Sequence, residues 1–132
     1  MSNFTNCLFL PCILLQIYIQ TSTNQIEQGI QLLTESACRV SEWAELNHLS
    51  LNTKKTKAIV FGTSNTITIF KELNISDIVI NRRGDSISFF DSVLSLGVVL
   101  DNTLSWKQQI QHVTKKVNRF LYGLRFIKSC TS

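Results

Sequence analysis

Apolar residues recur at alternating spacings of four and three positions after residue 22, which is the period of an amphipathic α-helix. They are Ile26, Ile30, Leu33, Ala37, Val40 and Ala44, with Trp43 and Leu46 widening the apolar face near its end. Ser22 and Gln25 have the spacing of a capping box, and Asn47 with His48 suits a helix C-terminus. The pattern therefore predicts a helix from about residue 24 to residue 46.

The segments before and after this helix have patterns typical of strands. Residues 3–20 are densely apolar and are divided by Pro11, which predicts a hairpin or broken strand that needs cover on both faces. The sequence LSLNTKKTKAIVFG, residues 49–62, indicates a helix exit, a basic turn and then a strand at residues 58–61.

Four further short strands are expected, at residues 66–70, 77–81, 86–89 and 93–100. The turn-forming residues 81–84 join the second and third of these into a hairpin. Gly97 lies inside the apolar run of the fourth, which predicts a bulge or a close backbone approach instead of a turn.

Residues 105–128 have the pattern of a second amphipathic helix, after Asp101 and Asn102 interrupt the strand. One side is apolar, with Ile110, Val113, Val117, Phe120, Leu121, Leu124 and Ile127. The other side carries Lys107, His112, Lys115, Lys116, Arg119 and Arg125, together with Tyr122 and Phe126. These elements predict an α+β fold in which two long amphipathic helices flank a mostly antiparallel sheet.

Charge is distributed unevenly along the 132 residues, a length that predicts one domain. The net charge is +4, and residues 107–128 hold six Lys and Arg with no acid, so the rest of the chain has seven bases against nine acids. A basic helix face with aromatic rings is suited to a phosphate backbone with some base stacking. An ordinary solvated helix face has the same composition, and the residues alone leave both interpretations open.

The four cysteines form no C-x-x-C pair and have no histidine at metal-ligand spacing, so we expect no zinc site. The apolar run of residues 7–19 has no basic segment before it, contains Pro11 and is too short to span a bilayer. We therefore expect no signal peptide and no membrane contact, and an intracellular chain in the cytoplasm or nucleus with reduced thiols. His48 is expected to be a helix-exit residue, because no ionisable group is placed to partner it.

Three motifs, SLNTKKTKAIVFG, SLGVVLD and LSW followed by the basic helix, occur in an order that resembles one enzyme family. Residues 15–128 are similar to the C-terminal palm and the start of the thumb of a reverse transcriptase from a non-LTR (LINE-type), jockey-like retrotransposon. The resemblance assigns residues 1–104 to the C-terminal part of the palm, with a degenerate hairpin at residues 1–20, and residues 105–132 to the start of the thumb.

The resemblance also implies roles for particular residues. Lys55 and Thr56 match the Lys-Thr that lies near the phosphates of the incoming nucleotide. Leu96, Gly97 and Val98 resemble the primer-grip strand, where glycine lets the backbone approach the primer end. The helix after Trp106 resembles the one that lies along the template-primer duplex, which implies RNA or DNA contact by Lys107, Lys115, Lys116, Arg119, Tyr122 and Arg125.

The resemblance breaks down at the catalytic centre. An aromatic-Ala-Asp-Asp sequence holds Mg²⁺ in the intact family, and Pro11, Cys12, Ile13 and Leu14 occupy those positions here. Hard Mg²⁺ needs oxygen ligands, so we expect no catalytic residues and no cofactor. The fingers and the first half of the palm also lie outside this sequence.

The interpretation is an inactive reverse-transcriptase remnant that retains some nonspecific nucleic-acid binding. A co-opted protein-interaction module and a nonfunctional pseudogene product are the alternatives. Residues 7–19 would lack palm neighbours in such a remnant, so self-association through this exposed edge is a further expectation.

Overall fold

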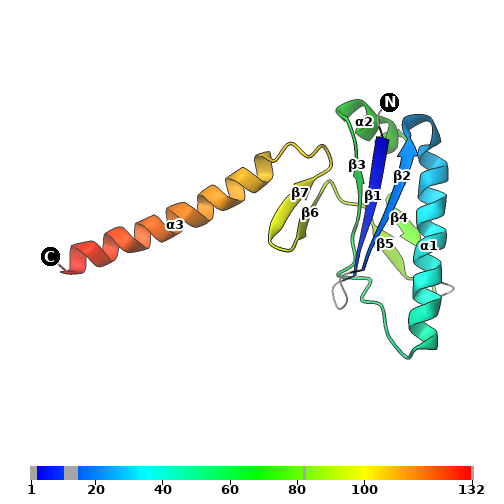
Figure 1. Ribbon diagram of the computed structural model, residues 1–132, viewed down its shortest axis with the longest axis horizontal. Coiled ribbons are helices and arrows are strands. Elements are labelled where there is room, and N and C mark those ends of the chain that lie inside the picture. Colours follow the sequence, from blue (N-terminus) through cyan, green and yellow to red (C-terminus); the bar gives the residue numbers. More distant parts are fainter. Residues whose placement is uncertain (1–2, 11–14, 82, 132) are drawn as a thin grey trace.

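Residues 3–10, 15–81 and 83–131 are described in a computed structural model, which has an α+β fold (Figure 1). Strands β1 and β2 come first, then a short 3₁₀ turn (η1), helix α1, strand β3, helix α2, strands β4 to β7 and helix α3. Their bounds are β1 Asn3–Leu10, β2 Leu15–Ser22, η1 Thr23–Gln25, α1 Ile26–Leu46, β3 Ala58–Phe61, α2 Ser64–Glu72, β4 Asp77–Val79, β5 Ser86–Ser88, β6 Ser92–Ser95, β7 Val98–Asp101 and α3 Lys107–Thr131.

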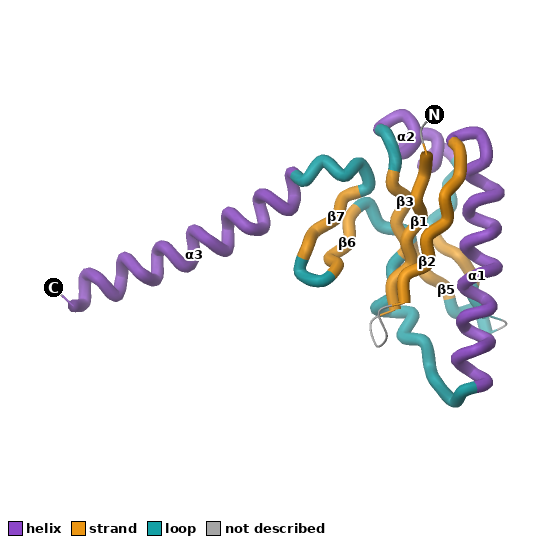
Figure 2. Tube along the Cα trace, in the orientation of Figure 1, coloured by secondary structure: helices purple, strands orange, loops and turns teal. Residues whose placement is uncertain are grey.

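The strands form three small antiparallel sheets, where the sequence predicted one (Figure 2). Their orders are β2-β1-β3, β4-β5 and β6-β7. An isolated parallel bridge between Ala58 and Phe89 links β3 to the end of the second sheet. Mixed helix and antiparallel sheet are therefore confirmed, but the sheet is divided because strands β4 to β7, of three or four residues each, pair only with their hairpin partners.

Strand β3 is buried on both of its faces, and its predicted position is confirmed. Ala58 and Val60 face the larger core, which α1, α2 and the β4-β5 hairpin complete. Ile59 points the opposite way and packs with Val93 of β6, with Phe61 and Leu100 against them. Because successive side chains of a strand point to opposite faces, this single short strand joins the two hydrophobic clusters.

Helix α1 covers the β2-β1-β3 sheet on one face, as the helical spacing predicted (Figure 1). Its buried residues include Ile26, Ile30, Leu33, Ala37 and Ala44. The expectation for Trp43 and Leu46 was wrong, because these side chains are 55% and 81% exposed. They project from the side of α1 that faces away from the sheet, since the neighbouring Ser41 and Ala44 are only 4% and 2% exposed.

The two ends of α1 were predicted with unequal success. Ser22 makes no side-chain cap to the backbone, and its hydroxyl lies 3.3 Å from the Gln25 amide oxygen. The capping box is therefore absent, because η1 precedes the helix and α1 begins only at Ile26. The C-terminal stop is confirmed, since Asn47 Nδ2 donates to Trp43 O at 2.8 Å and His48 has a left-handed φ of 56°.

The expected strand at residues 66–70 is wrong, because this segment forms helix α2. The alternating sequence Thr-Ile-Thr-Ile-Phe has the period of a strand. However, Thr63 Oγ1 caps the helix by accepting from Thr66 N at 3.4 Å, and Ile67 and Phe70 then face the core one turn apart. The cap and the position of the core outweighed the alternation.

The strand expected at residues 93–100 is a hairpin, β6-β7, in which Ser95 pairs with Val98. Leu96 and Gly97 form its two-residue turn with φ values of 50° and 82°. A Cβ at Gly97 would meet nothing within 4 Å, so neither the bulge nor a close intramolecular approach is present. The turn at residues 81–84 is confirmed, since β4 and β5 pair antiparallel and Gly84 has a φ of 84°.

The N-terminal hairpin is confirmed by the pairing of β1 with β2, from Asn3↔Ser22 to Leu10↔Leu15. The connection at residues 11–14 lies outside the described residues. Exposed and half-buried side chains alternate along most of β2, so α1 covers one face of this strand, whereas cover on both faces was expected.

Helix α3 does not flank a sheet, and this part of the predicted architecture is wrong. It extends away from the rest of the molecule, and none of its described side chains is buried (Figures 1 and 2). Its contacts with the body are concentrated on β7, because the hairpin before it turns the chain outward.

Gly29 provides a test of the packing between α1 and β2. A Cβ built there would lie 2.7 Å from Thr21 Cγ2, too close for any real contact. We expect Gly29→Ala to lower the free energy of unfolding by about 1–2 kcal/mol, although alanine is normally the better helix former. Urea denaturation measures the change.

Gly123→Ala is the matched control, because a Cβ there meets nothing within 4 Å. It should raise the helix content of α3 by circular dichroism. Replacing Thr21 with serine removes the clashing methyl group and should reduce the cost of Gly29→Ala. An equal cost in both backgrounds would contradict the predicted clash.

Candidate nucleic-acid interface

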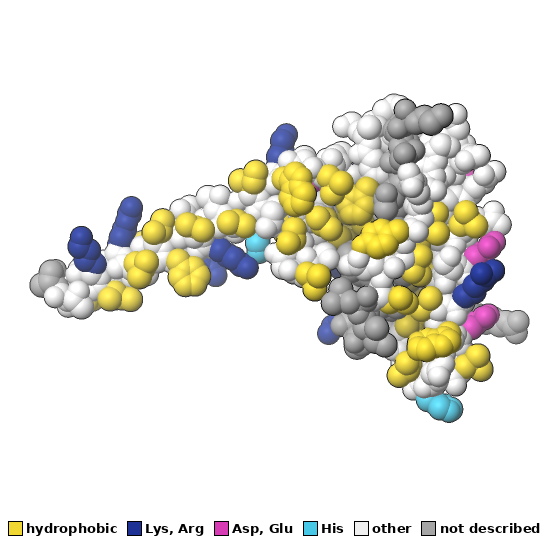
Figure 3. Space-filling view, in the orientation of Figure 1, with side chains coloured by type: hydrophobic (Ala, Val, Ile, Leu, Met, Phe, Trp, Pro, Cys, Tyr) yellow, Lys and Arg dark blue, Asp and Glu magenta, His cyan; other side chains and the backbone are white. Residues whose placement is uncertain are grey.

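Helix α3 is a continuous basic element that is exposed along its whole length. Its 25 residues extend about 37 Å at 1.5 Å per residue. Dark blue side chains are spaced along it in Figure 3 with no acid between them on the visible face. The bases are Lys107, Lys115, Lys116, Arg119, Arg125 and Lys128. The six residues predicted to bind nucleic acid are the first five of these bases and Tyr122, and all six are exposed on this helix.

Two aromatic rings lie on the basic side of α3. Tyr122 is 75% exposed and Phe126 is 65% exposed. Their spacing of four residues places them one helical turn apart on the same face. Exposed rings of this kind can stack on unpaired bases, so the basic side offers both charge and stacking surface.

The carboxylate of Asp101 holds the loop that leads into α3. Its Oδ2 accepts from Thr103 Oγ1 at 2.8 Å and from Ser105 N at 3.0 Å, and its Oδ1 accepts from Trp106 N at 3.2 Å. Burial acts to raise the pKa of Asp101, but hydrogen bonds from the Ser105 backbone, Thr103, the Ser105 side chain and the Trp106 backbone outweigh it and lower the pKa to about 2.

The same loop contains two left-handed residues, Leu104 with φ of 52° and Trp106 with φ of 63°. Positive φ is unfavourable for bulky side chains, so the Asp101 hydrogen bonds must hold this conformation. The sequence interpretation treated Asp101 only as a strand breaker. The signal it missed is an Asp followed by Thr and Ser two and four residues later, a pattern that favours local side-chain capping.

Gln109 makes a second link between the hairpin and α3. Its Oε1 accepts from Val99 N at 2.7 Å, so the first turn of the helix is bound to β7. The three primer-grip-like residues therefore belong to the hairpin from which α3 begins. Leu96, 76% exposed, and Gly97 are at its tip, and Val98 begins β7.

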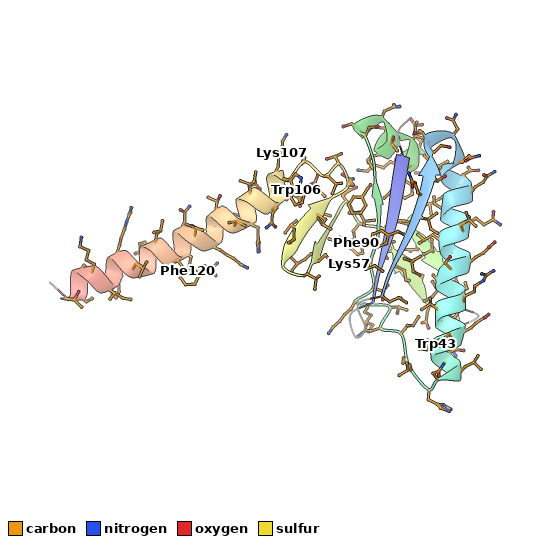
Figure 4. All side chains as sticks on the ribbon, in the orientation of Figure 1. Trp43, Lys57, Phe90, Trp106, Lys107 and Phe120 are labelled. Carbon is orange, nitrogen blue, oxygen red and sulfur yellow. The ribbon has the colours of Figure 1, made fainter. Side chains whose placement is uncertain are left out.

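The Lys55-Thr56 pair lies in a turn before β3, apart from α3. Thr56 is 2% exposed, and its hydroxyl donates to Asn52 O at 2.9 Å. The Lys55 amide also bonds to Asn52, while its side chain is exposed. Lys57 immediately precedes β3, and its side chain lies over Phe90, with Nζ 4.9 Å from the centre of the ring (Figure 4).

The part of the chain that the structure describes contains neither a metal-ligand cluster nor a helix able to span a membrane. Within residues 3–10, 15–81 and 83–131, no three His, Cys, Asp or Glu side chains converge as metal ligands. No helix in those ranges combines the length and apolarity needed to cross a bilayer. Ile13 and Leu14, which replace the family's aspartates in the sequence, lie outside the described residues.

Asp101→Asn should loosen the loop between β7 and α3. Loss of hydrogen bonds to a charged group should lower the free energy of unfolding by about 1–3 kcal/mol and speed amide exchange at Ser105 and Trp106. The folded-state pKa of about 2 lies below the unfolded value of about 3.9. The stabilisation is therefore complete above about pH 4 and is lost as the pH falls toward 2.

Asp77→Asn is the control, because Asp77 is exposed. It should leave amide exchange at Ser105 and Trp106 unchanged. Equal exchange in the Asp101→Asn variant and the unmodified chain would show that the carboxylate does not hold the loop.

Comparison with known proteins adds no relative to this description. A scan against protein-family models, a search of curated proteins and a search of solved structures each returned no match. The candidate interface is thus defined by the chain's own residues, a basic helix fixed at one end to a hairpin by Asp101 and Gln109.

Proposed function

We propose that this chain is a remnant of a non-LTR retrotransposon reverse transcriptase that has lost polymerase activity and binds nucleic acid nonspecifically through α3. The observation that carries the proposal is the exposure of a 25-residue helix with six basic residues, no acid and two exposed rings on its basic side. The order of the three sequence motifs supports the family origin.

The charge pattern of α3 suits a phosphate backbone in particular. Lys107 and Arg125 are 18 residues apart, which is five helical turns, so both lie on the same side about 27 Å from each other. Lys115 and Arg119 lie between them on the basic half of the helix. A row of cations on this scale can contact several successive phosphates and release their counterions, without reading any base.

The tip of the β6-β7 hairpin is the second place at which we propose that nucleic acid contacts the chain. Gly97 has no side chain, and open space surrounds the position that a Cβ would take. A nucleic-acid backbone can therefore approach the peptide groups at this turn closely. Leu96 is exposed beside it and offers apolar contact.

Loss of polymerase activity follows from the residue types at the catalytic positions. Nucleotidyl transfer with two Mg²⁺ ions needs carboxylates that converge on the metals. Ile13 and Leu14 have hydrocarbon side chains and cannot coordinate a cation. Glu27, the first acid in the sequence, belongs to α1 and is not part of the β1-β2 hairpin.

The protein should bind single- and double-stranded nucleic acid weakly and without sequence preference. Changing Lys115, Lys116 and Arg119 together to Glu should abolish binding, because the change removes three cations and adds three anions. Fluorescence anisotropy against a labelled oligonucleotide over a salt series measures this. Each phosphate contact contributes about 0.9 to the slope of log K against log salt for duplex DNA.

A charge-matched control separates local contact from net charge. Arg39, Lys54 and Arg83 are exposed and lie outside α3, and their change to Glu alters the net charge equally. This control should retain most of the binding. Unchanged binding in the α3 variant, or equal losses in both variants, would exclude α3 as the interface.

The purified chain should not extend a primer with any template, nucleotide or divalent metal. Restoring Asp at positions 13 and 14 should not rescue activity, because the family's remaining metal ligand and template-holding fingers lie outside this sequence. Primer extension with radiolabelled nucleotide and Mg²⁺ or Mn²⁺ measures this. Metal-dependent extension by the unmodified chain that Lys55→Ala abolishes would refute the proposed inactivity.

A further inference from the structure

The apolar side of α3 is uncovered in the monomer. Seven hydrophobic side chains occupy this side, and each is between 44% and 76% exposed. They are Ile110, Val113, Val117, Phe120, Leu121, Leu124 and Ile127. A contiguous apolar strip of this length on a soluble protein marks an interaction surface. An amphipathic helix also draws most of its stability from packing, so α3 needs a partner on this side.

The outer side of α1 has complementary properties. Leu32, Trp43 and Leu46 are 52%, 55% and 81% exposed there, although they belong to a helix that packs on the sheet through its other side. Four acids, Glu27, Glu35, Glu42 and Glu45, are exposed along the same helix, and Arg39 is its one base. The 21 residues of α1 extend about 32 Å, close to the length of α3.

A depression adjoins this surface near the C-terminal end of α1. It has a volume of about 540 Å³ and lies between α1 and β4, with Glu42, Glu45 and Arg83 among its lining residues. Ser41, which also lines it, is 4% exposed, and no hydrogen bond to its hydroxyl is found among the described residues. The depression gives a long side chain from a partner helix room beside two carboxylates.

The two helices cannot meet within one chain as it is folded. Helix α3 leaves the molecule on the side opposite α1, and its far end is directed away from it (Figure 1). Pairing α3 with α3 of another copy would bring together two helices that each carry six cations and no acid. Like charges at close range destabilise such a pair, which leaves the acidic α1 as the electrostatically favoured surface.

We propose that the apolar side of α3 docks on the outer side of α1 in a second copy of this chain. The same contact is made twice, so that each copy gives its α3 and receives the partner's, which closes a two-fold dimer. Leu32, Trp43 and Leu46 meet the apolar strip of α3. This interaction goes beyond nucleic-acid binding and uses the apolar side of the helix, with Lys116 and Arg125 at its two borders.

Charges at the borders of the apolar strip set the specificity of the contact. Lys116 lies one turn before Phe120, and Arg125 lies one turn after Leu121, so both flank the strip. On α1, Glu35 and Glu42 are one heptad apart and lie on the acidic side of the exposed apolar residues. Lys116 and Arg125 are nine residues, or about 2.5 turns, apart, so they border opposite edges of the strip. Docking places Glu35 and Glu42 beside one of these two basic edges.

Charge reversal on each helix tests the proposal, with no nucleic acid present. The α1 variant carries Glu35→Lys and Glu42→Lys, and the α3 variant carries Lys116→Glu and Arg125→Glu. Sedimentation equilibrium should show a dimer for the unmodified chain and a dissociation constant at least about tenfold higher for each variant alone, which corresponds to 1.4 kcal/mol. Circular dichroism checks that both variants are folded.

Mixing the two variants gives the decisive measurement. In an equimolar mixture, the basic α3 of one chain meets the acidic α1 of the other, and the acidic α3 meets the basic α1. Each contact again joins opposite charges, although in one of them the acidic helix is α3 and the basic helix is α1. The mixture should therefore dimerise like the unmodified chain. The control variant carries Glu72→Lys and Asp77→Lys, which change two exposed acids outside α1 and α3. It should dimerise like the unmodified chain.

Three results would overturn the proposal. An unmodified chain that stays monomeric at high concentration excludes the dimer. Association that neither variant weakens places the contact elsewhere, such as the open edge of β2. A loss in the α3 variant that mixing does not restore indicates pairing of α3 with itself. Retained or lost nucleic-acid binding affects none of these readings, because the measurement contains no nucleic acid.

Discussion

The burial of β3 on both faces is the constraint on which the rest of the structure depends. Ala58 and Val60 complete the core under α1, while Ile59 completes the smaller cluster under the β6-β7 hairpin. Fully burying an Ile or Val side chain contributes about 1.5–3 kcal/mol, so a shift of this four-residue strand weakens both clusters together. Its backbone also accepts from Phe90 N at 2.9 Å, which fixes where the hairpin starts.

A short series of hydrogen bonds connects β3 to the base of α3. Gly62 N donates to Asn102 O at 2.9 Å, Asn102 N donates to Asp91 O, and the Asp101 carboxylate and Gln109 then hold the first turn of the helix. No described side chain of α3 is buried, so these few contacts at its base set its direction. The helix thereby presents its six cations well away from a body that is net negative.

The two sides of α3 suit different partners, and the two proposals are compatible for that reason. Lys115, Arg119 and Tyr122 lie on the basic side, where a polyanion is attracted by charge at little desolvation cost. The apolar strip gains free energy only when water is excluded, which requires a shaped protein surface such as the outer side of α1. A dimer held through the strips would leave Lys115, Arg119 and Tyr122 of each α3 available to one nucleic-acid strand.

The sequence by itself determined the elements whose periodicity agrees with their burial. Helix α1, the helical character of the α3 segment, strand β3, the N-terminal hairpin and the turn at residues 81–84 were all predicted, because local spacing and turn chemistry specify them. Local pattern also placed the basic residues of the candidate interface on one helix, although Lys128 was not in the predicted binding set. The role of Asp101 was missed although Thr103 and Ser105 follow it at the spacing of a local cap, because that pattern does not show that the Trp106 amide also donates to the carboxylate.

Only the tertiary structure decided how these elements are placed. Alternation at residues 66–70 favours a strand, but the Thr63 cap and the core under Phe70 make it a helix. Leu96 and Gly97 look like part of one apolar strand until Ser95 pairs with Val98 across a two-residue turn. An amphipathic pattern likewise shows that α3 has an apolar side, but not what covers it. The reason is physical: periodicity is a property of one segment, whereas cover depends on which other segment lies against it.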